Sequence, residues 1–212
     1  MEQQYDIIVA GSGISGCLAA AGAASGGAKV LLLDRNDYSQ VGKKTNWGWV
    51  CGDAVAKTHV DFINKEIGLQ LREPVLDVKV DGVQVLSPDL TRKFQFEGAG
   101  YSLDRPKLAK VLVDFAVKSG AEYLSHHEVE GPIVENDAVV GVYGRDEKGA
   151  QYKVRSKLVI DGLGVASTIR RKLPPNKYIE NMVSTDDIEG HTSHANRPIR
   201  GLESYGKECE GR

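Results

Sequence analysis

The sequence has few cysteines and no long apolar run. Its 212 residues include three cysteines, Cys17, Cys51 and Cys209, which lie far apart and form no Cys-x-x-Cys pair. This usage indicates a reducing, cytoplasmic setting, and no spacing of cysteine and histidine predicts a metal site. No apolar stretch reaches the length of a membrane span, and the start MEQQYD lacks the basic region of a signal peptide.

An excess of one charge is also missing. Lysine and arginine number 27 against 29 aspartates and glutamates, giving a net charge of −2 without a strongly basic block. That balance gives no support for nucleic-acid binding. The length suits one α/β domain with an appendage or two small domains. Glycine is abundant, at 24 residues, as expected where a backbone must approach a ligand.

What is present is a glycine-rich turn between a strand and a helix. The apolar, β-branched stretch Tyr5–Ala10 predicts a buried parallel strand. Gly11, Gly13 and Gly16 then form the pattern G-x-G-x-x-G. Small and apolar residues without proline continue over Ile14–Ser25 and predict a helix that packs tightly on a sheet.

Each part of this turn suits a dinucleotide. Gly11 permits a sharp turn, Gly13 lets a diphosphate approach the main chain, and Gly16 permits close contact of helix and strand. The helix N-terminus offers free N–H groups to phosphates. A second strand, Lys29–Leu33, ends at Asp34, 18 residues after Gly16, where a carboxylate can bind the hydroxyls of an adenosine ribose. The βαβ unit alone does not distinguish FAD from NAD(P) as the ligand, but the carboxylate of Asp34 disfavours the 2′-phosphate of NADP.

The middle of the chain changes character. Asp53 is the predicted N-cap of a helix over residues 54–67. From Leu76 the sequence becomes rich in β-branched residues: Val78–Val85 predicts a hairpin that turns at Asp81-Gly82, and Lys93–Phe96 another strand. We interpret this material as the start of a second, substrate-side domain.

The βαβ pattern then returns. Asp104 caps a predicted helix that ends at Gly120, and a short strand follows. Further predicted elements are three antiparallel strands (Val129–Val134, Val139–Tyr143, Tyr152–Val154), a buried strand (Lys157–Ile160) and a helical piece (Val165–Lys172). The stretch from Lys177 to Arg212 is polar and without periodicity, and predicts an irregular tail.

Four blocks in this order resemble a known family. They are YDIIVAGSGISG with LLLDR, then VCGDAV, YSLDRPKLAKVLVDFAVKSGA and LVIDGLGVASTIRRKLP. Together they resemble the geranylgeranyl reductases, especially the archaeal members, within the p-hydroxybenzoate hydroxylase-like flavoproteins. The resemblance implies an α/β, Rossmann-like FAD-binding fold with inserted antiparallel strands. We expect residues 1–75 and 100–175 to form the FAD-binding domain, and 76–99 and 176–212 a partial substrate domain with the tail.

The resemblance also implies a reaction. Family members bind FAD and reduce isolated C=C bonds of isoprenoid chains, such as those of archaeal membrane lipids, by hydride transfer from the reduced flavin. An isoprenoid lipid substrate would imply a peripheral contact with the membrane, and the electron donor stays open between ferredoxin and NAD(P)H. Within the same fold group, an aromatic monooxygenase is the alternative, and a third reading is a non-catalytic flavin-binding fragment.

Site residues follow from the resemblance by position. The diphosphate would lie at Gly11, Gly13, Ser15 and Gly16, with the adenosine ribose at Asp34 and Arg35. The remaining cofactor contacts would come from Cys51, Gly52, Ala54, Arg105, Val129 (through its backbone, toward the adenine) and Asp161. Cys51 is also the candidate catalytic residue, with a packing or proton-supply role preferred over a nucleophile and an inert buried cysteine as the alternative.

One expected feature is absent from the sequence. The family carries a second cofactor motif, of the G-D-A-A-G kind, and an aromatic, proline-containing substrate motif, and neither occurs in the 212 residues. The chain therefore resembles the front half of such a reductase, as a truncated reading frame, a split gene or an expressed fragment would.

Overall fold

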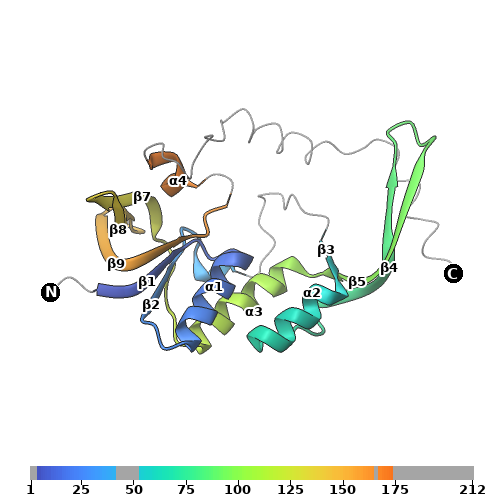
Figure 1. The fold of residues 1–212 in the computed structure, drawn as a ribbon, viewed down its shortest axis with the longest axis horizontal. Helices are drawn as coiled ribbons and strands as arrows, with labels where there is room; N and C mark the ends of the chain where they lie inside the picture. The colour runs from blue at the N-terminus through green and yellow to red at the C-terminus, as the bar shows by residue number, and fades with distance from the viewer. Residues whose placement is uncertain (1–3, 42–52, 165–166, 174–212) are drawn as a thin grey trace.

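The computed structural model of the protein describes residues 4–41, 53–164 and 167–173 (Figure 1). In chain order the elements are β1 (Gln4–Ala10), α1 (Ile14–Ser25), β2 (Val30–Leu33), η1 (Tyr38–Gln40), β3 (Ala54–Ala56), α2 (Lys57–Phe62), η2 (Ile63–Ile67), β4 (Leu76–Leu86), β5 (Lys93–Leu103), α3 (Arg105–Lys118), β6 (Glu122–Leu124), β7 (Glu128–Glu135), β8 (Ala138–Arg145), β9 (Gln151–Asp161) and α4 (Thr168–Lys172).

The main sheet has six strands in the order β6-β2-β1-β9-β8-β7. Strand β1 pairs in parallel with β2 on one side and with β9 on the other, and β2 pairs in parallel with β6. The β7-β8-β9 part is antiparallel. The β1-α1-β2 unit is therefore a βαβ crossover at the centre of a mixed sheet, as the sequence predicts.

Two apolar layers cover the faces of this sheet. On one face α1 and α3 pack on Val9, Val30 and Leu32. On the other face, Ile8 and Leu31 pack against residues of β7, β8 and α4. The curled meander β7–β9 and the short α4 lie above the second face in Figure 1. Alternate residues of β1 and β2 point to opposite faces, and both faces are covered. Nearly every residue of these short strands is therefore apolar.

Three glycines allow the ends of β1 and β9 to meet the start of α1. Gly11 has φ +97°, and a Cβ built there would lie 2.5 Å from the carbonyl oxygen of Gly162. A Cβ on Gly16 would lie 1.9 Å from the carbonyl oxygen of Gly11. Gly162 N–H donates to the Ala10 carbonyl oxygen at 2.8 Å. The predicted turn and helix are confirmed, since α1 begins and ends where the sequence indicates.

Several predicted boundaries are wrong. The two predicted strands Tyr152–Val154 and Lys157–Ile160 form one strand, β9, which pairs antiparallel with β8 at its start and parallel with β1 along its second half. Leu158 within it is 52% exposed, so the stretch is not wholly buried. The sequence could not show this because a strand that changes partners has no local signal for the change.

The predicted hairpin turn at Asp81-Gly82 is also wrong. Residues Leu76–Leu86 form a single strand, and the turn to β5 follows Leu86. The register shifts between Val80 and Gly82, so the glycine lies at an irregularity in the ladder. Glycine marks a bulge as readily as a turn, and here cross-strand pairing decides between them.

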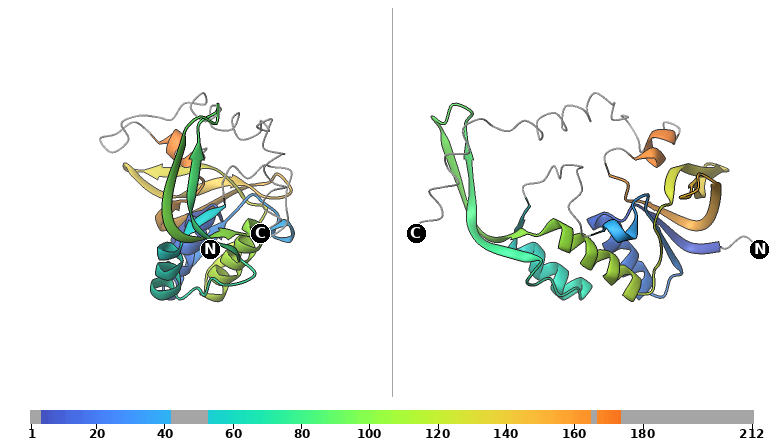
Figure 2. Two further views of the ribbon diagram at one scale, coloured as in Figure 1. Left: turned by 90° about the vertical axis from the view of Figure 1, so that its right-hand side faces the viewer. Right: turned by 180° about the vertical axis from the view of Figure 1, so that it is seen from behind.

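The β4-β5 hairpin extends away from the rest of the molecule. In Figures 1 and 2 it is a long two-stranded arm beyond α2 and α3, on the opposite side from the main sheet. Among the described strands, the short β3 alone joins it, where Ala54–Ala56 pairs with Gly100–Ser102 at the base. None of the helices within the described ranges combines the length and the hydrophobicity needed to cross a bilayer.

The close approach at Gly16 can be tested within one helix. We expect Gly16→Ala to lower the free energy of unfolding by about 1–3 kcal/mol, because the added methyl group overlaps the Gly11 carbonyl. Gly22→Ala is the matched control: Gly22 is exposed in the same helix, and its Cβ would meet nothing within 4 Å. Urea denaturation should show Gly22→Ala neutral or stabilised by up to about 1 kcal/mol. Equal stability of the two variants would contradict the contact.

Candidate dinucleotide-binding site

The turn between β1 and α1 presents main chain rather than side chains. Gly13 is the N-cap of α1, and no side chain caps the helix. Gly13, Ile14 and Ser15 are exposed, whereas Gly11 and Gly16 are buried. A Cβ built on Gly13 would meet nothing within 4 Å. The N–H groups of a first helical turn have no intrahelical partners, so this surface suits an anion.

Asp34, at the end of β2, is connected to the same turn. The Ser12 N–H and hydroxyl both donate to Asp34 Oδ2, at 2.6 and 2.8 Å. The Asn36 N–H donates to Asp34 Oδ1 at 2.8 Å. A carboxylate can accept about four hydrogen bonds, so Oδ1 retains capacity for a further donor such as a ribose hydroxyl. The carboxylate therefore fixes the turn and lies beside the open surface at Gly13.

A buried polar layer lies beneath the turn. The Cys17 thiol donates to the Ser12 carbonyl oxygen at 3.2 Å. Burial raises the pKa of Cys17 to about 12, and the nearby Asp34 charge adds to the rise, so the thiol stays protonated at neutral pH. Burial likewise raises the pKa of Tyr123 to about 12, and the nearby Ser12 hydroxyl offsets part of the rise. That hydroxyl donates to Asp34 Oδ2 at 2.8 Å, so its hydrogen is directed away from Tyr123. The Tyr123 hydroxyl is buried and lacks a hydrogen-bond partner among the described residues.

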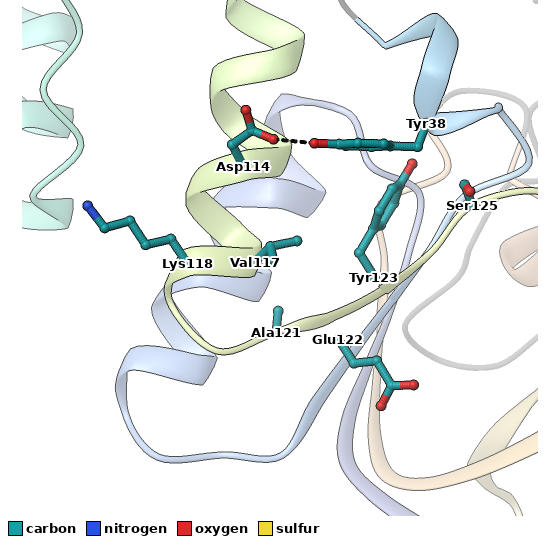
Figure 3. A pocket seen from close by; sticks show the side chains of 8 residues that line it. All are labelled: Tyr38, Asp114, Val117, Lys118, Ala121, Glu122, Tyr123 and Ser125. Carbon is teal, nitrogen blue, oxygen red and sulfur yellow. Dashed lines mark hydrogen bonds between the residues drawn. The ribbon is translucent and has the colours of Figure 1, made fainter.

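Tyr123 also borders a surface hollow of about 600 Å³ between η1, α3 and β6 (Figure 3). Tyr38 covers one end, with its ring edge-on to Tyr123 at a centroid distance of 5.9 Å and its hydroxyl donating to Asp114 at 2.6 Å. Neither the glycine turn nor Asp34 lines this hollow. It is therefore separate from the surface that suits a diphosphate.

Arg105 begins α3 and is oriented by Asp53. The two form an ion pair with Nε 2.9 Å from Oδ1, and the arginine side chain is 17% exposed. The prediction that Asp53 caps a helix is wrong: Ala54 begins β3, and the N-cap of α2 is Ala56. Asp53 has φ +54°, and its carbonyl oxygen accepts from Leu103 N–H at 2.7 Å. It therefore joins the strand before α3 to the start of β3.

The other predicted contacts lie at different places. The Val129 carbonyl oxygen accepts from the Thr168 hydroxyl at 2.7 Å, and its side chain is buried. The Asp161 carboxylate accepts from Leu163 N–H at 3.1 Å and from the Ser167 hydroxyl, so it holds its own turn beside Gly162. Asp161 ends β9, which pairs with β1 beside the glycine turn, whereas Val129 lies on β7 at the far edge of the sheet. Their roles toward a cofactor stay predictions.

Arg35 and Ala54 are both exposed, so each side chain is accessible from solvent. Cys51 and Gly52 lie outside the described residues, as do the predicted tail and the helical residues before Ser167. Within the described ranges no group of three or more histidine, cysteine, aspartate or glutamate side chains could hold a metal ion.

The residues present fit a dinucleotide. The open space above Gly13, the uncapped first turn of α1 and the carboxylate at Asp34 lie together. Sequence reasoning missed Ser12, Tyr123 and the pairing of Asp53 with Arg105. Ser12 lies inside the glycine pattern and could have been predicted from it. Tyr123 has no such sequence signal, because only the pairing of β6 with β2 brings it near the turn.

Comparison with known proteins defines the class. A model of the family described as FAD dependent oxidoreductase matches residues 6–169. The chain belongs to this family, and the predicted Rossmann-like FAD-binding fold, FAD as cofactor and the oxidoreductase class are confirmed.

Two related proteins indicate a narrower group within the FAD-dependent oxidoreductases. The chain is 29% identical over 206 residues to the digeranylgeranylglycerophospholipid reductase of Sulfolobus acidocaldarius, covering 90% of this chain and 44% of that protein. It is 33% identical over 194 residues to one such reductase of Methanococcoides burtonii, covering 89% and 44%. The resemblance to geranylgeranyl reductases is thus confirmed. The chain spans less than half the length of these relatives.

Solved structures agree with the fold. A geranylgeranyl bacteriochlorophyll reductase-like protein of Thermoplasma acidophilum superimposes with a TM-score of 0.69 at 27% identity, covering 85% of this chain and 44% of that one. A myxobacterial chondrochloren halogenase superimposes with a TM-score of 0.67 at 21% identity, covering 80% and 39%. The second likeness concerns the fold alone.

The Tyr123 hydroxyl, which has no hydrogen-bond partner within residues 4–41, 53–164 and 167–173, gives a stability test. We expect Tyr123→Phe to leave the free energy of unfolding unchanged or raise it by up to about 1 kcal/mol, because a buried hydroxyl without a partner is costly. Tyr5→Phe is the control, since the Tyr5 hydroxyl donates to Glu122 at 2.7 Å and its removal should cost about 1–2 kcal/mol. Thermal and urea unfolding measure both. A Tyr123→Phe loss as large as that of Tyr5→Phe would contradict the assignment.

Proposed function

We propose that the chain is the dinucleotide-binding part of an FAD-dependent reductase that saturates C=C bonds in the geranylgeranyl chains of archaeal membrane lipids. The observation that carries the proposal is the similarity over about nine-tenths of the chain to reductases named for that lipid substrate. The glycine turn and Asp34 support the nucleotide part of the proposal independently.

The chain's own residues would bind and orient the cofactor. In this proposal Gly11, Gly13, Ser15 and Gly16 surround the diphosphate, and the first-turn N–H groups of α1 donate to its oxygens. Asp34 accepts from the adenosine ribose, with Arg35 beside it. When bound, reduced flavin supplies a hydride for an alkene carbon, and a proton must reach the neighbouring carbon.

The flavin end of the site would involve other residues. Arg105 is held by Asp53 at the start of α3, so it enters the proposed site already oriented. The roles of Cys51, Gly52 and Ala54 along the flavin remain predictions, as do those of Val129 and Asp161. We also propose, with the boundaries given above, that the protruding hairpin belongs to the substrate side.

Aromatic monooxygenation is the alternative of the same fold group. Flavin-dependent halogenases and a hydroxylase superimpose on this chain, but at 21–22% identity, which is a likeness of fold. The reductases are more similar in sequence, so reduction is preferred. Ferredoxin or NAD(P)H as electron donor and a peripheral membrane contact stay predictions.

The nucleotide site can be tested by titrating the 212-residue chain with FAD. We expect saturable binding, a higher melting temperature in the presence of FAD, and a flavin absorbance that dithionite bleaches. ADP should compete for the site, because the proposed contacts lie on the adenosine diphosphate half. Absence of both FAD and ADP binding would contradict the proposal.

Gly13→Val separates binding from folding. The Gly13 backbone is extended, with φ −68° and ψ −178°, and its Cβ would meet no protein atom. We therefore expect the free protein to stay folded, with a slightly lower melting temperature because valine is a poorer N-cap than glycine. Its affinity for FAD and ADP should be at least tenfold weaker, about 1.4 kcal/mol, because the side chain occupies the space of the diphosphate. Gly22→Ala, in the same helix, should bind both as the unaltered chain does.

A further inference from the structure

The main chain of Asp34 is fixed on both sides of its side chain. Its N–H donates to the Leu124 carbonyl oxygen at 3.1 Å, and its own carbonyl oxygen accepts from the His127 N–H at 2.8 Å. The end of β2 is thus tied to the end of β6 and to the segment that follows β6. The residue as a whole is half-buried, so the carboxylate has a defined position and is still accessible to a sugar.

The two oxygens of this carboxylate are not equivalent. Oδ2 accepts two hydrogen bonds from one residue, the N–H of Ser12 at 2.6 Å and its hydroxyl at 2.8 Å. Oδ1 accepts one, from the Asn36 N–H at 2.8 Å. Each oxygen of a carboxylate has about two acceptor sites. Counting the donors within residues 4–41, 53–164 and 167–173, Oδ2 is saturated and Oδ1 has one site left.

The Ser12 hydroxyl is the donor that depends on the residue type. Any residue other than proline would donate its N–H at this position, whereas the second bond to Oδ2 needs a hydroxyl. That hydroxyl does not cap α1, because the N-cap is Gly13 and no side chain bonds to the first turn. An alanine at position 12 would leave Oδ2 with one open acceptor site beside the one on Oδ1. The residue at position 12 therefore sets how many donors Asp34 can take from a ligand.

This number matters because an adenosine ribose has two neighbouring hydroxyls, at C2′ and C3′. When both oxygens of a carboxylate are open, each hydroxyl can donate to one of them. With Oδ2 saturated, that paired arrangement is blocked and a single hydroxyl can bond to Oδ1. Hydrogen bonds to a charged oxygen are stronger than those between neutral groups, so one bond more or less is measurable as a change in affinity.

We propose that Ser12 is a specificity-determining residue of the nucleotide site: by occupying Oδ2 it limits Asp34 to one ribose hydroxyl. The chain then accepts adenosine diphosphates that lack the other hydroxyl of the sugar. This inference rests on the proposed function, because it takes the ribose of the dinucleotide to lie at Asp34.

A purely structural role of the Ser12 hydroxyl has a different consequence. The glycine turn has other bonds, since the Gly11 N–H donates to the Leu33 carbonyl oxygen at 2.7 Å and the Cys17 thiol donates to the Ser12 carbonyl oxygen at 3.2 Å. A hydroxyl that only held this turn would affect the binding of every adenosine diphosphate by the same factor. A hydroxyl that limits Asp34 changes the ratio of affinities between nucleotides with different sugars, so this ratio is the quantity to measure.

The test titrates the 212-residue chain calorimetrically with ADP, 2′-deoxy-ADP and 3′-deoxy-ADP. We expect one of the two deoxy nucleotides to bind at least about tenfold more weakly than ADP, because it lacks the hydroxyl that donates to Oδ1. The other should bind within about twofold of ADP, because its missing hydroxyl has no acceptor site on Asp34. Similar losses for both analogues, or a loss for neither, would overturn the proposal.

Ser12→Ala should change this pattern. Oδ2 is then open to the second hydroxyl, so the analogue that the unaltered chain tolerates should bind the variant at least about fivefold more weakly than ADP does. Circular dichroism and thermal unfolding of the free variant establish that it remains folded. If the affinity ratios of the three nucleotides are the same in the variant and in the unaltered chain, Ser12 does not limit Asp34 and the proposal is wrong.

Ser15→Ala is the matched control within the same turn. Ser15 is exposed, and its proposed contact is with the diphosphate, which the three nucleotides share. Any change in affinity should therefore be the same factor for all three, and the ratios should stay those of the unaltered chain. A change of the ratios equal to that in Ser12→Ala would contradict the role assigned to Ser12.

The same titrations distinguish this inference from the proposed function. If neither ADP nor FAD binds the chain, the proposed nucleotide site is wrong and the role of Ser12 is wrong with it. If ADP binds and competes with FAD but the deoxy nucleotides do not follow the expected pattern, the nucleotide site stands and the inference about Ser12 alone is overturned.

Discussion

The structure depends on the contact of backbone with backbone at three glycines. Gly11, Gly16 and Gly162 bring the end of β1, the start of α1 and the end of β9 so close that a methyl group on any of them would overlap or crowd a neighbouring main-chain atom. That closeness fixes the direction in which α1 leaves the sheet. The first-turn N–H groups then point to the surface above Gly13, where a diphosphate can approach.

Two carboxylate side chains add further contacts around this backbone arrangement. Asp34 connects β2 to the glycine turn through Ser12, and Arg105 is held by Asp53 at the start of α3. Both carboxylates are fixed by hydrogen bonds before a ligand arrives, so little ordering remains to oppose binding. The cofactor of the family is FAD, and the arrangement of these residues is consistent with binding of the adenosine diphosphate half of FAD.

The two ends of the molecule differ in how far their apolar side chains are buried. The βαβ end has a continuous core on both faces of its sheet, with Ile8, Leu31 and Leu32 fully buried. The hairpin end presents phenylalanines and valines to solvent from a ribbon of two strands. A domain normally buries such a face against a second layer, and none of the described residues of this chain provides one over these side chains.

The sequence by itself determined the elements whose signals are local. The strand Tyr5–Ala10, the helix Ile14–Ser25 and the cap at Asp104 follow from apolar runs, glycine stops and a capping residue within a few positions. Those signals and the spacing to Asp34 sufficed for the nucleotide fold, whereas the family resemblance also required the later blocks VCGDAV and YSLDRPKLAKVLVDFAVKSGA.

Only the tertiary structure decided the long-range features. Asp53 pairs with Arg105, 52 residues away, instead of capping a helix. Tyr123 lies under the glycine turn because β6 pairs with β2. Strand β9 is continuous because β8 and β1 pair with its successive halves. Such features depend on which strands become neighbours, and a one-dimensional pattern of polar and apolar residues does not encode that choice locally.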